Sequence, residues 1–471
     1  MKNHFIIWST LLLIAILASA CKVGKDYERP EVSLPDNFRN VSFADTSSIA
    51  SLPWKTFLTD TALQNLVNKG IQYNYNLQMA VNRIGIAEAA LKQAKAAGLP
   101  QVNLLVSGQY NRPSNNSLSG LSTSSFLGSS HIENYNAGLS VAWEADTWGK
   151  IRRGKEAALA TYLQTYEATR AVQTQLVADI ARGYFNTLLL AGQLGIARQA
   201  LRLSDSVLQM TTLLKEAGET NSLAVQQADV QKQTTALLIP QLEESLALQE
   251  NALQVLTGQL PAPLKLSATL GDVTVPVSLP PGVPSALLSR RPDIRAAELA
   301  LTAANARAGV AQGNLYPVLN ITAAGGIESF KASNWFNIPG SLFGIAGGTL
   351  LTPVFNRREL KTRYEIAKKE REQAVLQFRE TVLNAVGEVS DALVRHEKLA
   401  QQQEIAVKRA ALLKTAVANA KLLYQSDMAN YLEVISAQTN ALQAELSLAD
   451  ICRAQRDNMV ELYRSLGGGW K

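Results

Sequence analysis

An internal repeat constrains the fold of this chain more than any other feature of its sequence. The segment that begins at Asn76 recurs 217 residues later at Asp293, and the segment around Leu213 recurs 209 residues later around Leu422. Each copy reads as a helix, two β segments and a long helical hairpin, and a proline-rich linker at residues 258–290 separates the copies. The repeat therefore predicts two halves built from the same elements in the same order.

Two unusually long helices are expected, at residues 150–216 and 359–424. Both segments lack proline and are rich in Ala, Leu, Gln, Glu, Lys and Arg, which favour a helix. A helix of about 65 residues is about 100 Å long, whereas helices in globular proteins average ~10–14 residues. The last helix also carries two adjacent apolar stripes at heptad spacing. Each long helix is therefore expected to pack against a neighbour on both sides, as in a wall of helices.

Four β segments are expected, and each alternates apolar with polar residues, as a strand with two different faces does. The apolar face is expected to include Val102, Leu104, Val106, Leu139, Val141, Leu319, Ile321, Phe343, Ile345 and Leu351. A soluble sandwich strand would show the same alternation. Aromatic residues near the segment ends and a long Ser-rich connection at residues 113–133 instead favour a membrane barrel.

Four strands are too few for one chain to close a membrane barrel, because such barrels begin at eight strands. An open sheet edge in lipid leaves backbone groups unpaired at several kcal/mol each. Either the strands lie outside the membrane, or several copies share one barrel; two copies and three copies are both physically allowed. In a shared barrel the polar face would line a wet lumen. The lumen residues expected are Asn103, Ser107, Gln109, Asn136, Ser140, Glu144, Asn320, Thr322 and Glu328.

The composition argues against an enzyme, a metal site and a nucleic-acid partner. Lys plus Arg number 45 against 39 Asp plus Glu, too small an excess for a nucleic-acid-binding face. Three His and two Cys leave little for a metal or nucleophilic site. Residues 149–156 approach a phosphate-binding loop, but Glu156 stands where the Mg²⁺-binding Ser or Thr is required. We expect no catalytic residue, metal or nucleotide.

The N-terminus reads as an export signal. Lys2 precedes an apolar run too short to span a bilayer comfortably, and small residues follow it. Cys21 directly after them is typical of a bacterial lipoprotein, in which the cysteine is acylated and becomes the first residue. Lys22, where inner-membrane lipoproteins carry Asp, points to the outer membrane. We expect a covalent lipid on Cys21 and no other cofactor; the alternative is an ordinary secreted protein.

Three stretches resemble the outer-membrane factors, the TolC-like channels of bacterial efflux systems. They are Cys-Lys-Val-Gly-Lys-Asp-Tyr-Glu-Arg-Pro at residues 21–30, Leu-Leu-Ser-Arg-Arg-Pro-Asp-Ile at residues 287–294, and Asn-Tyr-Leu-Glu-Val at residues 430–434. The resemblance implies a lipid-anchored homotrimer with a twelve-stranded outer-membrane barrel and a periplasmic tunnel of twelve helices. It also implies a periplasmic adaptor and an inner-membrane pump, commonly of the resistance–nodulation–division type, as partners.

The expected fold class is therefore mixed, mainly α with β, with a trimeric outer-membrane barrel that takes four strands per chain and continues into a periplasmic coiled-coil barrel. The expected segments are a signal peptide (1–20), a lipidated extended segment (21–50), first-repeat helices (51–100), a β-hairpin (101–147), a helical hairpin (148–257), the linker (258–290), a second-repeat helix (291–317), a second β-hairpin (318–355), and a second helical hairpin with the C-terminus (356–471).

The resemblance places a gate at the two hairpin turns, residues 216–222 and 425–430, at the periplasmic tip. The gate candidates are Tyr424, Asp427, Glu433 and Ser436. In the family Tyr424 has an acidic partner and a nearby arginine, but these positions align with Ala224 and Ala429. The sequence therefore leaves open how such a gate is locked.

The expected function is that of a passive conduit in a tripartite efflux pump, which exports drugs or other toxic small molecules. The alternatives are an exit duct for type I protein secretion, a coiled-coil adaptor of the envelope, and, least favoured by the composition, an envelope enzyme. Basic residues cluster at the start of both long helices, around Lys150 and around Arg357. They either contact lipid phosphates or form a solvated face.

Overall fold

The computed structural model describes residues 23–38, 48–266, 268–273, 280–426 and 428–470. The predicted signal peptide, the lipid anchor Cys21 and the gate candidate Asp427 lie outside these ranges. The helices and strands are η1 (Ile49–Ser51), α2 (Trp54–Phe57), α3 (Thr61–Tyr73), α4 (Tyr75–Ala96), β1 (Gln101–Asn111), α5 (Leu118–Leu127), β2 (Ile132–Ala145), α6 (Lys150–Glu216), α7 (Ser222–Leu256), η2 (Pro284–Ala286), α8 (Leu287–Arg290), α9 (Pro292–Gly313), β3 (Val318–Ser329), η3 (Ala332–Asn334), β4 (Leu342–Leu351), α10 (Glu359–Gln425) and α11 (Tyr431–Ser465).

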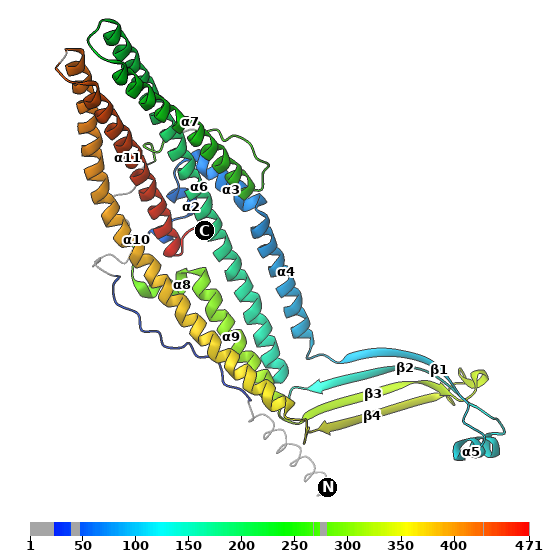
Figure 1. Ribbon diagram of the computed structural model, residues 1–471. Coiled ribbons are helices and arrows are strands. Elements are labelled where there is room, and N and C mark those ends of the chain that lie inside the picture. Colours follow the sequence, from blue (N-terminus) through cyan, green and yellow to red (C-terminus); the bar gives the residue numbers. More distant parts are fainter. Residues whose placement is uncertain (1–22, 39–47, 267, 274–279, 427, 471) are drawn as a thin grey trace. The chain divides into compact units, whose positions relative to one another are not determined.

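The repeat appears in the structure element by element (Figure 1). Helices α6 and α10 have 67 residues each, and α7 and α11 have 35 each. Helices α4 and α9, which precede the two strand pairs, have 22 residues each. The predicted order of helix, two strands and long helical hairpin in each half is confirmed, and so are the two long helices.

The chain divides into two compact units, and each unit takes segments from both repeats. The first unit comprises residues 1–30, 85–163 and 298–376, and it contains the sheet. The second comprises residues 31–84, 164–297 and 377–471, and it contains both helical hairpin turns. The four helices α4, α6, α9 and α10 contribute residues to both units.

The strands form a four-stranded antiparallel sheet in the order β1-β2-β3-β4, one layer in Figure 1. Residues directly opposite each other in neighbouring strands lie on the same face. Asn103 pairs with Ser140, Ser107 pairs with Asn136, and Asn136 pairs in turn with Glu328. The register therefore brings polar residues of β1, β2 and β3 onto one face, while Val102, Val141 and their neighbours share the other.

The apolar face predicted for β4 was wrong. Phe343 pairs with Gly326, which pairs with Gly138, so Phe343 lies on the polar face. Ile345 opposite Ala324 and Leu351 opposite Val318 lie there too. The physical reason is space above the glycines: a Cβ added to Gly138 would approach the Phe343 ring to 3.1 Å. The β4 side chains on this face therefore cover the backbone of the neighbouring strands at glycines, which have no side chain of their own.

The long Ser-rich connection between β1 and β2 contains a short helix. Helix α5 has 10 residues, and the side chain of Ser117 caps it by accepting a hydrogen bond from the Gly120 amide. Phe126 on this helix is 89% exposed. In the described part of the chain, none of the helices has the length and hydrophobicity that a membrane crossing requires.

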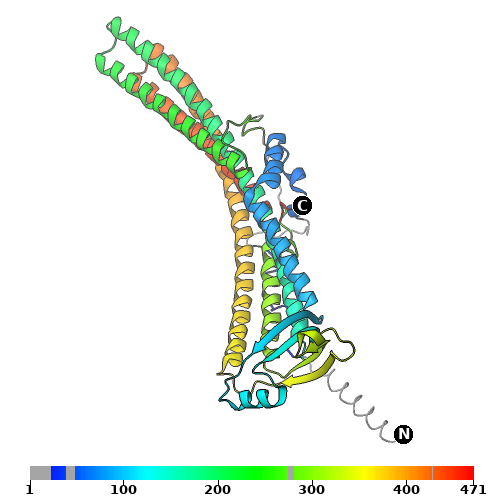
Figure 2. The ribbon, with the colours of Figure 1, turned by 90° about the vertical axis from the view of Figure 1, so that its right-hand side faces the viewer.

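In the second unit, the two helical hairpins run side by side, α6 with α7 and α10 with α11 (Figures 1 and 2). Asn221 and Asn430 occupy equivalent positions in the two hairpin turns, and each caps the following helix through its side-chain oxygen. The fully buried apolar side chains of this unit include Leu63, Val67, Ile180, Tyr184, Phe185, Val207, Leu253, Phe378, Val382 and Leu462.

Candidate lumen and gate

The nine predicted lumen residues all lie on one face of the sheet, as the pairing register shows. Each of them is exposed or half-buried. Glu328 accepts a hydrogen bond of 3.0 Å from Asn134, and Glu144 forms an ion pair with Lys150 at the start of α6. This face can hold water and polar solutes, because it presents amides, hydroxyls and carboxylates.

Exposed aromatic and apolar residues lie near the ends of the strands. Tyr110, Trp143, Phe330 and Phe355 are all exposed, and Phe355 after β4 is 87% exposed. Trp148 is held in place, because its indole N–H donates to the Pro317 carbonyl at 2.6 Å. Aromatic girdles of this kind mark the two interfaces of membrane barrels.

A small apolar cluster joins the two hairpins near their turns, and we call it the latch. It consists of Val207 on α6, Tyr424 on α10 and Val434 on α11, packed by Met210, Leu214, Ala420 and Tyr431. The Tyr424 hydroxyl donates to Oγ1 of Thr211 on α6 over 3.2 Å, and Thr211 in turn donates to the Val207 carbonyl. Thr211 is fully buried and Tyr424 is 7% exposed.

The contacts of the latch differ from those that the resemblance implied. The gate candidate Tyr424 has a partner, but the partner is the neutral Thr211 and not the aligned position Ala224. Ala224 is fully buried at the start of α7, where its amide donates to the capping Asn221. Sequence reasoning missed Thr211, because no local motif marks a hydroxyl whose partner lies 213 residues away.

Two further gate candidates, both in the described part of the chain, lie outside the latch. Glu433 and Ser436 are both exposed on α11. Glu433 lies in the first turn of this helix, where its amide donates to the Asn430 side chain. A carboxylate there is favoured by the helix dipole. Ala429 in the turn is half-buried.

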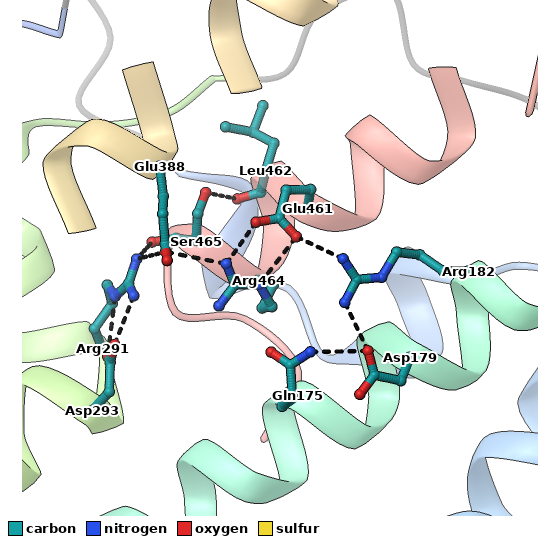
Figure 3. Close-up of polar contacts among 10 residues, drawn as sticks. All are labelled: Gln175, Asp179, Arg182, Arg291, Asp293, Glu388, Glu461, Leu462, Arg464 and Ser465. Carbon is teal, nitrogen blue, oxygen red and sulfur yellow. Dashed lines mark hydrogen bonds and ion pairs between the residues drawn. The ribbon is translucent and has the colours of Figure 1, made fainter. Parts of the chain in front are cut away.

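The Arg-Arg-Pro-Asp stretch builds a polar network in the second unit, drawn in Figure 3. The Arg291 guanidinium donates twice to Asp293, once to Glu388 on α10 at 2.7 Å, and once to the Ser465 carbonyl at the end of α11. Arg464 of α11 contacts the same Glu388 at 3.1 Å. Arg291 therefore ties the start of α9 to both helices of the second hairpin, which is a structural role.

Charge pairing shifts the pKa values in this network. Burial alone would raise the pKa of Asp293, but the hydrogen bonds and charge of Arg291 hold it below its ordinary value. Glu461 behaves in the same way, because Arg464 and Arg182 outweigh its burial and lower its pKa. Asp457 differs: burial raises its pKa in spite of Arg453.

The segment that resembles a phosphate-binding loop is the start of α6, and its backbone amides already donate hydrogen bonds within the protein. The amides of Ile151 and Arg152 both donate to the Asp146 carboxylate at 2.8 Å. These are the groups that a phosphate would have to contact. Among the described residues, no group of three or more His, Cys, Asp or Glu side chains is arranged to hold a metal ion.

The extended N-terminal segment is bound to the first unit by both repeats. Arg153 of α6, whose side chain is 3% exposed, donates to the Gly24 carbonyl and to Asp26. Glu298 of α9 accepts two hydrogen bonds from Arg29 and one from Tyr27. The predicted basic cluster at Lys150 is therefore largely paired within the protein, and Arg153 is not part of a solvated face.

Comparisons with known proteins agree with this architecture. A profile of the outer membrane efflux protein family matches residues 66–259 and 283–468. The cation efflux system protein CusC of Escherichia coli O6:H1 is 30% identical over 461 residues, which cover 97% of this chain and 98% of that protein. The outer membrane protein OprJ of Pseudomonas aeruginosa is 29% identical over 98% of this chain and 95% of its own length.

Solved structures show the same fold. A CusC structure has a TM-score of 0.82 at 30% identity and covers 95% of this chain and 100% of its own. The open state of the MtrE outer membrane channel of Neisseria gonorrhoeae has a TM-score of 0.86 at 25% identity and covers 96% of this chain and 99% of its own. The two-faced sheet and the paired long hairpins, shared with these structures, define an outer-membrane efflux channel.

This chain belongs to the outer membrane efflux protein family. The predicted resemblance, fold class and outer-membrane location are thereby confirmed. The relatives are channel proteins and not enzymes.

Proposed function

We propose that three copies of this chain form a passive, water-filled conduit whose inner end is closed by the latch at the hairpin turns. The observation that carries the proposal is the buried Tyr424–Thr211 hydrogen bond, because it fastens one hairpin to the other inside a single chain. Release of this contact would let the hairpins separate. The nine polar residues on one face of the sheet would line the outer part of the conduit.

The open edges of the sheet support an assembly of several copies. Four strands per chain leave two open edges, at β1 and at β4, and only a shared barrel removes them. Two copies would also reach the minimum of eight strands, and the choice of three rests on family membership. A periplasmic adaptor and an inner-membrane pump of the resistance–nodulation–division type are the proposed partners. The pump would select the cargo, a small molecule, and the conduit itself would carry out no chemistry.

Acylation of Cys21 is the proposed anchor. Its support is the sequence around it and the docking of Gly24, Asp26 and Arg29 on α6 and α9, which holds the next residues of the chain on the first unit. Expression with a labelled fatty acid should label the wild type and leave Cys21→Ala unlabelled. Equal labelling of both would refute the anchor.

The conduit is tested with the full chain, purified in detergent and added to planar bilayers. We expect a trimer by native mass spectrometry and cation-conducting, mostly closed single channels. The open time of the Tyr424→Phe channel is compared with that of a control, Thr415→Val. The control removes an exposed hydroxyl of α10 outside the latch. A monomer without conductance, or equal open times in the two variants, would contradict the proposal.

A further inference from the structure

We propose that a basic pocket in the first unit binds the phosphate group of a membrane phospholipid. The pocket has a volume of about 500 Å³ and lies between the N-terminal segment, α9 and α10. Three cationic side chains line it, Lys25, Lys368 and Arg371, and none of the described residues in its lining is acidic. This inference rests on the proposed membrane anchor, which places the pocket near lipid.

The three cations have no partner of their own. Within the described residues, Lys25, Lys368 and Arg371 form neither a hydrogen bond nor an ion pair through their side chains. Lys368 lies only over the Tyr364 ring, with its Nζ atom 5.8 Å from the centroid. An anion in the pocket would supply the missing partner.

The acids next to the pocket in sequence do not line it. Glu370 and Glu372 flank Arg371 along the chain, and Glu372 pairs with Lys369 at 2.7 Å. Asp26 next to Lys25 pairs with the buried Arg153 at 2.9 Å. Lys369 lowers the Glu372 pKa most, and Lys368 and Arg371 contribute to lowering it, but within the described residues no acid forms a hydrogen bond or an ion pair with the three cations of the pocket.

Hydrogen-bonding groups and a fixed wall complete the pocket. Asn305 and Gln312 of α9 line it, and Asn305 also donates to the Lys25 carbonyl at 3.0 Å, which fixes that stretch of backbone. Gly24 and Gly309 form part of its wall, and a Cβ on Gly24 would approach the Gly309 Cα to 3.1 Å. Phosphate oxygens accept hydrogen bonds from amide and ammonium groups, so this donor set fits a phosphate.

The position along the chain favours a lipid over a free phosphate. Cys21 lies three residues before Gly24, so an extended chain can place it no more than about 11 Å away. Lipid chains on Cys21 would therefore enter the bilayer close to the pocket. Each Lys or Arg near an anionic lipid surface adds measurably to binding, and three of them meet here.

The test uses the full-length trimer in detergent, stripped of lipid and titrated with phosphatidylglycerol while bound lipid is counted by native mass spectrometry. The pocket variant replaces Lys25, Lys368 and Arg371 by Gln. The control variant replaces Lys95, Lys155 and Lys361 by Gln, which removes equal charge from exposed sites of the same unit that do not line the pocket. We expect one phosphatidylglycerol per chain, retained by the control and bound about 100-fold more weakly by the pocket variant.

Equal lipid affinity in the wild type and the pocket variant would overturn the proposal. So would displacement of the lipid by inorganic phosphate at matched concentration, because the site would then serve a free anion. Planar-bilayer conductance separates this inference from the proposed function: a conducting pocket variant without bound lipid supports both. A wild type that forms no channel contradicts the function, and one that conducts but binds no lipid contradicts the pocket alone.

Discussion

Removal of the Tyr424 hydroxyl should open the channel by a predictable amount. The hydroxyl forms a buried, neutral hydrogen bond, which contributes about 1 kcal/mol net. Three chains of the proposed trimer each lose one such bond in Tyr424→Phe, about 3 kcal/mol in all if the latches act together. At about 1.4 kcal/mol per factor of ten, the ratio of open to closed channels should rise about 100-fold.

Thr211→Val should open the channel further than Tyr424→Phe. This change leaves the Tyr424 hydroxyl buried without an acceptor, which costs about 1–3 kcal/mol per chain. The double variant replaces both groups by apolar ones of similar shape, so its latch should be close to the wild type in stability. Open probability in single-channel recordings should therefore follow the order Thr211→Val, Tyr424→Phe, then the double variant and the wild type.

The salt dependence of opening is a second, independent test of the latch. The partners are uncharged, so the closed state should keep its stability between about 0.1 and 1 M salt, over which ionic contacts are strongly screened. Thr415→Val, an exposed change on α10, is the control and should behave like the wild type. Two results would refute a neutral latch. One is a double variant whose open probability reflects the summed effects of the two single changes, and the other is a wild type that opens when the salt concentration alone is raised.

Three further predictions concern other parts of the chain. Glu433→Gln should reduce cation over anion selectivity in reversal-potential measurements, because an exposed carboxylate at the start of α11 would form a ring in the trimer; unchanged selectivity would remove Glu433 from the conduit. Arg291→Met should destabilise the protein by about 1–3 kcal/mol, because Asp293 loses its cationic partner while the half-exposed Glu388 keeps Arg464, whereas Met in place of the exposed Arg202 should have little effect. The folded state lowers the Asp293 pKa, so the stability that this carboxylate contributes is present above the ordinary pKa of 3.8 and is lost as pH falls through the folded pKa. The melting temperature of the wild type should therefore drop more between pH 6 and pH 3 than that of Arg291→Met. Equal drops would contradict this role of Asp293. Arg358→Gly should stabilise the protein by about 1 kcal/mol, because Arg358 has a φ of 63° whereas the equivalent residue of the first repeat is Gly149; a lower melting temperature would show that the guanidinium is needed there.

The repeat made most of the fold predictable. Helix composition and the absence of proline defined α6 and α10, because a long helix is decided by local preference and by apolar stripes that run its whole length. Alternation likewise placed the faces of β1, β2 and β3. In β4 the glycines at 344, 347 and 348 weaken the alternation, and the face is decided by pairing with β3 and by the space above Gly138.

The candidate gate was predictable only in part. Tyr424 could be proposed from a motif, but its partner Thr211 depends on how two hairpins pack, and no periodicity within either hairpin encodes that contact. The Arg-Arg-Pro-Asp stretch was recognisable as a family feature, yet its contacts with Glu388 and Ser465 appear only when α10 and the end of α11 are in place. The sequence therefore did not predict contacts between residues that lie far apart along the chain.

The repeat is not symmetric at the latch. The positions equivalent to Tyr424 and Thr211 in the opposite halves are Lys215 and Ala420, which cannot reproduce the hydroxyl pair. In a ring of three chains, the junctions between hairpins would then alternate between fastened ones inside a chain and differently built ones between chains. In such a ring the latch would hold the three junctions inside the chains, and its release would widen those junctions while the boundaries between subunits keep their own contacts.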